Sequence, residues 1–93
     1  MAAAITLRDS SVQRGSVEAV NGTGFLPGRT LIQYINGQFA GVAVTGPYGN
    51  IGYGNSLDVL EAQANLPVGA SKPVLVRDAT DPTVSATATI TVT

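Results

Sequence analysis

Short runs of alternating apolar and polar residues fill most of the chain, and clusters of Gly, Pro, Asn and Asp separate them. The clearest run is the last, residues 85–93 (SATATITVT), in which small or branched apolar residues alternate with threonine. A period of two is typical of a strand with one buried face and one wet face. Because such runs recur along the whole chain, we expect an all-β protein, built as a sandwich or barrel.

Seven segments carry strand signals. Asn36-Gly37 lies between two of them and predicts a type I′ hairpin turn, since both central residues of that turn need a positive φ angle. Residues 56–64 (SLDVLEAQA) also show helical spacing behind a serine suited to cap a helix, but Leu57 and Val59 alternate, and we favour a strand. The seven strands are expected at 5–8, 17–21, 31–36, 39–44, 57–62, 73–78 and 85–93.

Composition fits one folded domain over residues 1–93, with 1–4 as a flexible N-terminal segment. Hydrophobic residues make up 44% of the chain and charged residues 12%, which is far from the composition of a disordered polyampholyte. The net charge of -1 offers no electrostatic footprint for nucleic acid or for a membrane surface. We therefore expect neither as a partner.

Catalysis and cofactor binding are not expected either. The chain has no cysteine and no histidine, which removes the usual thiol nucleophile and the commonest general base and metal ligand. The six carboxylates are scattered singly. Asp78 and Asp81, with Asp9 as a neighbour, keep a calcium site open, but the sequence DATDP fits an ordinary hairpin turn better, and we predict no metal site.

Two surfaces are candidates for partner binding. In the strand expected at 31–36, Ile32 and Tyr34 share the face opposite Leu31 and Ile35, so both faces are apolar although only one can point into a sandwich. The second surface is the loop 46–55 (GPYGNIGYGN), whose mixture of Tyr, Gly and Asn is typical of binding loops. Its tyrosines could equally fold back to cover the sandwich. The predicted partner-binding residues are Tyr48, Asn50, Tyr53, Asn55, Ile32 and Tyr34.

Several segments together resemble the bacterial and phage immunoglobulin-like modules that include IPT/TIG-type domains. The resemblance rests on GTGFLPG at 22–28, the following Asn36-Gly37, NLPVG at 65–69 and ATATITV at 86–92. It implies an immunoglobulin-like β-sandwich of about seven strands, in which Phe25 plugs a tight crossing made by glycines. The chain departs from the pattern at 17–20, where we expect a bulge, and at the inserted loop 46–55.

The resemblance implies a non-catalytic structural or adhesive module. We expect a phage virion protein, either an outer capsid decoration or a tail appendage, which is made in the host cytoplasm and contacts capsid or tail subunits. The N-terminus MAAAITLRDSS lacks the features of a signal peptide, which agrees with that setting. The alternative is a carbohydrate- or receptor-binding module excised from a bacterial surface protein or secreted glycosidase, located outside the cell. The sequence leaves open whether the chain also associates with copies of itself as a homo-oligomer.

Overall fold

The structure, a computed structural model, describes residues 3–13, 15–52, 56–59, 69 and 71–93, with residues 56–59 described by their backbone. Each of the seven predicted strands has a counterpart in it, and a two-residue strand, β2, is added. The strands are β1 (Ala4–Leu7), β2 (Ser11–Val12), β3 (Ser16–Thr23), β4 (Thr30–Ile35), β5 (Gln38–Val44), β6 (Ser56–Val59), β7 (Ser71–Asp78) and β8 (Ser85–Val92).

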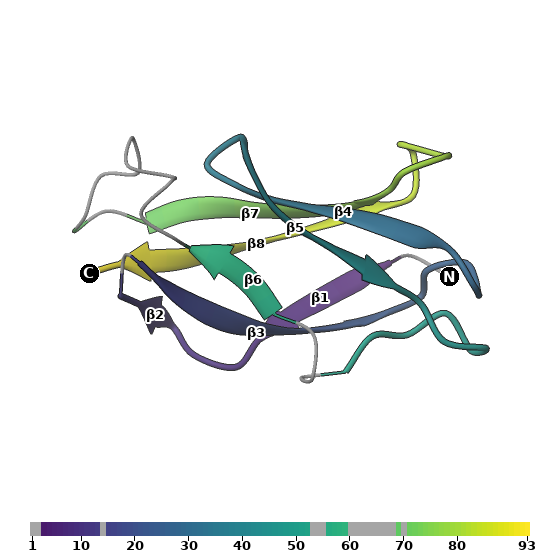
Figure 1. The fold of residues 1–93 in the computed structure, drawn as a ribbon, viewed down its shortest axis with the longest axis horizontal. Coiled ribbons are helices and arrows are strands. Elements are labelled where there is room, and N and C mark those ends of the chain that lie inside the picture. The colour runs from purple at the N-terminus through teal and green to yellow at the C-terminus, as the bar shows by residue number, and fades with distance from the viewer. Residues whose placement is uncertain (1–2, 14, 53–55, 60–68, 70) are drawn as a thin grey trace.

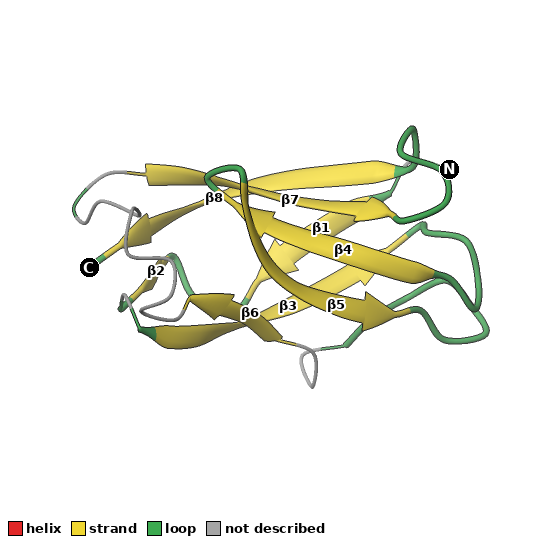
Figure 2. Cartoon of the chain, turned by 45° about the horizontal axis from the view of Figure 1, so that its top comes forward, coloured by secondary structure: helices red, strands yellow, loops and turns green. Residues whose placement is uncertain are grey.

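The strands form two sheets that pack as a small β-sandwich (Figures 1 and 2). One sheet has the order β1-β3-β6 and the other the order β2-β8-β7-β4-β5. All pairings between these strands are antiparallel except that of β2 with β8, which is parallel. The predicted all-β sandwich is thus confirmed, whereas its immunoglobulin-like connectivity stays a prediction.

The β4–β5 hairpin turns as the sequence predicts. Asn36 has a φ angle of 51° and Gly37 one of 78°, so both central residues lie in the left-handed region that a type I′ turn requires. Beyond the turn, Tyr34 pairs with Phe39 and Gln33 pairs with Gly41. The residue between these partners, Ala40, is therefore the extra residue of a bulge in β5.

The bulge predicted at residues 17–20 is wrong, because β3 pairs in unbroken register with both β1 and β6. Glu18 consequently falls in phase with Val20 and Gly22, and all three are buried. A carboxylate can occupy this inward position because its Oε2 atom accepts the backbone N–H of Asp9 at 2.6 Å. The hydrogen bond, rather than a bulge, accommodates the polar residue.

The core lies between the sheets and takes most of its apolar side chains from alternate positions of the long strands, where Glu18, Gln33 and Asp78 are buried as well. Phe25, at 4% exposure, plugs the crossing that follows β3, as predicted. A Cβ atom at Gly22 would lie 3.0 Å from the Phe25 side chain and 3.0 Å from the Ile51 side chain, so a larger residue there would have to displace both. The buried cluster comprises Val12, Val20, Phe25, Leu31, Ile35, Ala40, Ala43, Ile51, Val74, Val76, Ala86, Ile90 and Val92.

Two of the predictions concern where a strand begins or ends. β6 confirms the favoured strand over Ser56–Val59, and residues 60–64 lie outside the described part of the chain. Ala4, expected in a flexible terminal segment, is the first residue of β1, and residues 1–2 are also outside the description. Within the described ranges there is no helix long and apolar enough to cross a membrane.

Candidate functional site

The outward side of β4 carries the two strand residues that the sequence singled out. Leu31 and Ile35 are fully buried at 0% exposure, whereas Ile32 and Tyr34 alternate with them and are half-buried on the opposite face of the sheet. The predicted division of β4 into an inward and an outward apolar face is therefore correct.

The sheet register surrounds these two residues with further apolar side chains. Ile32 lies opposite Val42 of β5, and Tyr34 lies opposite Phe39 of β5 on one side and Leu75 of β7 on the other. Residues directly opposite each other on one face are in side-chain contact range. The resulting surface, the outer apolar face, consists of Ile32, Tyr34, Phe39, Val42, Val44 and Leu75.

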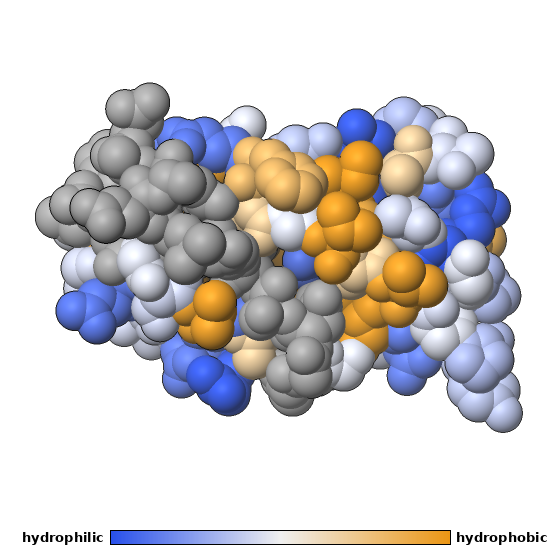
Figure 3. Space-filling view, in the orientation of Figure 1, coloured by the Kyte–Doolittle hydropathy of each residue, from blue (hydrophilic) through white to orange (hydrophobic). Residues whose placement is uncertain are grey.

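The part of this face on β5 is the most open. Phe39 is 60% exposed, Val42 52% and Val44 66%. Hydrophobic side chains gather along β5 in the middle of Figure 3, on the side of the molecule seen in Figure 1. β5 is also the end strand of its sheet and carries no charged residue and no proline, the usual protection of an exposed edge.

These β5 residues were missed as site residues by the sequence reasoning. The sequence does carry a pattern that indicates them, because the run from Phe39 to Val44 is apolar on both faces, as β4 is. A strand that buries only one face needs no apolar residues on the other. Val42 and Val44 are therefore indicated by the same pattern that indicates Ile32 and Tyr34.

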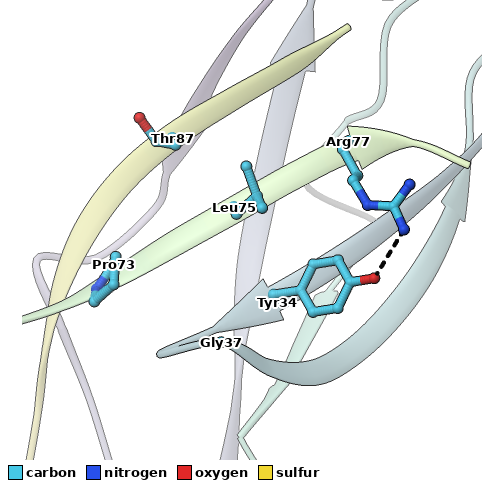
Figure 4. Close-up of a pocket in the computed structure, with 6 residues that line it drawn as sticks. All are labelled: Tyr34, Gly37, Pro73, Leu75, Arg77 and Thr87. Carbon is cyan, nitrogen blue, oxygen red and sulfur yellow. Dashed lines mark hydrogen bonds between the residues drawn. The ribbon is translucent and has the colours of Figure 1, made fainter. Parts of the chain in front are cut away.

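A hollow of about 460 Å³ opens on the same face beside Tyr34 (Figure 4). Leu75 lies between Thr87 and Tyr34 in the sheet register. At one end, a guanidinium N–H of Arg77 donates to the Tyr34 hydroxyl at 3.3 Å, and the Arg77 Cζ atom lies 5.7 Å from the centre of the tyrosine ring. These contacts hold the ring and the cation together at the rim. The lining residues are Tyr34, Gly37, Pro73, Leu75, Arg77 and Thr87.

The described part of the inserted loop, residues 46–52, is tied to the crossing at 22–28. Ile51 exchanges two backbone hydrogen bonds with Gly22, at 2.9 and 3.0 Å, and the Phe25 N–H donates to the Gly49 carbonyl at 3.1 Å. Ile51 is 4% exposed and belongs to the core cluster. The described part of the loop therefore closes one end of the sandwich.

Tyr48 stands apart from this packing. It is 88% exposed, and Asn50 is exposed beside it, so neither residue is held as a cover. The seven residues of β5, which span about 20 Å, separate the Tyr34 end of the hairpin from the loop that carries Tyr48. The predicted site residues thus fall into two groups rather than one surface. Tyr53 and Asn55 lie outside the described residues.

Asp78, which the sequence left open as a calcium ligand while favouring a turn residue, anchors a turn. It is fully buried, its Oδ1 atom accepts the N–H groups of Thr80 at 2.8 Å and Asp81 at 3.1 Å, and Arg29 forms an ion pair with it at 3.2 Å. Burial raises the pKa of the Asp78 carboxyl, but the N–H groups of Asp81 and Thr80 and the Arg29 guanidinium together lower it below its ordinary value. Asp78 therefore anchors the β7–β8 turn as an anion.

Glu18 is a second buried carboxyl, and its environment shifts its pKa in the opposite direction. It is 1% exposed, and burial raises its pKa above the ordinary value, although the Asp9 N–H opposes this change. Asp9 itself forms an exposed ion pair with Arg8 at 3.1 Å. Among the residues that the structure describes, no three acidic side chains come together as a metal site would need.

Comparison with known proteins gives no relative for this chain. Neither the protein-family models nor the curated proteins nor the solved structures contain a match. The resemblance to IPT/TIG-type modules accordingly stays a prediction from the motifs at 22–28, 36–37, 65–69 and 86–92.

Proposed function

We propose that this chain is a non-catalytic structural module that binds another protein through the outer apolar face. The observation that carries the proposal is the continuity of that face across β4, β5 and β7, with Phe39, Val42 and Val44 each more than half exposed. Contiguous exposed apolar residues are uncommon on monomeric proteins and mark sites where a partner removes them from water.

A phage virion is the setting we propose for this contact, with a capsid or tail subunit as the partner. The support is the motif resemblance together with a surface suited to permanent assembly, since permanent interfaces are the more apolar ones. Association of the chain with copies of itself through the same face would be a variant of this function.

Glycan binding is the second candidate, and Tyr48 is the observation that favours it. An aromatic ring exposed to 88% in a loop rich in Gly and Asn provides a flat stacking surface next to adaptable polar groups. The loop lies beyond the far end of β5 from Tyr34. Its contribution can therefore be measured separately from that of the outer apolar face.

Val42→Lys is expected to weaken attachment to the partner by about tenfold or more, because it places a charge at the centre of the apolar contact. Val17→Lys is the matched control, since Val17 is 49% exposed on β3 of the other sheet, against 52% for Val42. The tagged variants are produced in the organism that encodes the chain, and the fraction attached to its assembly is measured.

Both variants should keep the thermal unfolding temperature within a few degrees of the parent chain. Equal attachment of the Val42→Lys and Val17→Lys variants would contradict the proposal. If Tyr48→Ala loses attachment while Val42→Lys retains it, the glycan-binding alternative replaces the proposed function.

A further inference from the structure

Arg77 is a cation on the outer apolar face without an anion to match it. The outward positions of β4, β5, β7 and β8 carry no acidic residue, and the neighbouring Asp78 points into the core. Arg29 and Arg8, by contrast, each form an ion pair with an aspartate. No ion pair of Arg77 is present among the described residues, so its charge faces a surface that is otherwise neutral.

The guanidinium is nevertheless held in a defined position. One of its nitrogens donates to the Tyr34 hydroxyl and the other terminal nitrogen donates to the Asp78 carbonyl, both at 3.3 Å. The planar fork of arginine has further N–H groups beyond these two bonds, and it suits a carboxylate. Figure 4 shows the guanidinium at the end of the hollow, next to the tyrosine ring and on the side away from Pro73.

We propose that this hollow receives an apolar side chain of the partner protein, and that an aspartate or glutamate next to that side chain pairs with Arg77. The inference rests on the proposed function and adds the chemistry of the partner. Leu75, Pro73 and the Tyr34 ring provide the apolar contact, and Arg77 provides the complementary charge. The same face of a second copy is a poorer occupant, because it offers no carboxylate at these outward positions.

The expected selectivity is modest and depends on salt. Arg77 is partly exposed, and exposed ion pairs change affinity by about two- to fivefold at low ionic strength. Screening at about 0.5 M salt should remove most of this preference, whereas the apolar contact should persist. The charge thus selects among apolar partners rather than providing most of the affinity.

Two capped dipeptides, acetyl-Leu-Glu-amide and acetyl-Leu-Gln-amide, test the inference as probes of equal shape. Each is titrated into the full ¹⁵N-labelled chain, and the backbone amide shifts of Leu75, Arg77 and Thr87 are followed. We expect weak binding of both at the hollow, with the Glu peptide about threefold tighter at low salt. Arg77→Gln should abolish the preference, and Lys72→Gln, a change of the other cation in β7, should keep it.

Equal binding of the two peptides, shifts located elsewhere, or a preference that survives Arg77→Gln would overturn the inference, as would no binding of either peptide. An unchanged amide spectrum of Arg77→Gln away from β7 and its neighbours β4 and β8 verifies that the fold is intact. Any of these failures leaves the proposed function standing if Val42→Lys still detaches the chain. Loss of the proposed function would instead appear as unchanged attachment of Val42→Lys.

Discussion

Replacing Gly49 by alanine is expected to destabilise the chain by about 3 kcal/mol or more, the largest effect of a single added methyl group at the glycines described in residues 46–52. Gly49 has a φ angle of 75°, and a Cβ atom there would lie 1.9 Å from the carbonyl oxygen of Phe25. That oxygen belongs to the backbone of the buried plug, so relief requires the crossing and the loop to separate. Chemical denaturation monitored by circular dichroism measures the loss.

Gly52→Ala is the matched control in the same loop. A Cβ atom at Gly52 would meet no heavy atom within 4 Å, and its φ angle is not in the left-handed region. The free energy of unfolding should therefore change by no more than about 0.5 kcal/mol. Similar losses for both variants, or no loss for Gly49→Ala, would contradict the close packing of Gly49 against the Phe25 backbone.

Replacing Asp78 by alanine is expected to lower the thermal unfolding temperature by roughly 10 °C or more at neutral pH. The change leaves the Thr80 and Asp81 N–H groups without their acceptor and Arg29 without its anion. Asp81→Ala is the control in the same turn, and it should cost much less because the Asp81 contacts with Thr83 are exposed. Comparable losses for the two variants would contradict the anchoring role of Asp78.

The charge of Asp78 also predicts a pH dependence, which Asp78→Asn isolates. Because the folded state lowers the pKa of this carboxyl, its stabilisation is present above the ordinary value of 3.8 and is lost as the pH falls through the folded-state value. The difference in unfolding temperature between the parent chain and Asp78→Asn should therefore shrink below about pH 4. Glu18, whose pKa is raised in the folded state, affects the pH dependence of stability with the opposite sign. It is present in both proteins, so its effect cancels in the difference between their unfolding temperatures.

The strands were predictable because their information is local. The apolar run of β4, the alternation along β8 and the Asn36-Gly37 turn each specify structure within a few residues, and all are present. The bulge in β5 was not predictable, since Ala40 has no property that distinguishes it from its neighbours. Glu18 misled the prediction because its hydrogen-bond donor, the Asp9 N–H, comes from the segment after another strand.

The candidate site was predictable only in part, for the same reason. Ile32 and Tyr34 were found from one strand, whereas the neighbours that turn them into a surface come from the register of β5 and β7. The position of Arg77 beside the Tyr34 ring depends on the pairing of β4 with β7, and the two residues lie 43 positions apart in the sequence. The role of the loop depended on contacts between Gly49 and Phe25, which no local pattern indicates.

Site-specific photocrosslinking tests the central claim, binding of a partner protein through the outer apolar face, most directly. A benzophenone amino acid is placed at Val42 or Val44 on that face, and at Val17 on the other sheet, where exposure is similar to that of Val42. The labelled chains are irradiated in the native assembly, and the products are identified by mass spectrometry. We predict a protein crosslink to one defined partner surface from Val42 and Val44 and none from Val17. Crosslinks from Val17 alone, or none from Val42 and Val44, would contradict the claim.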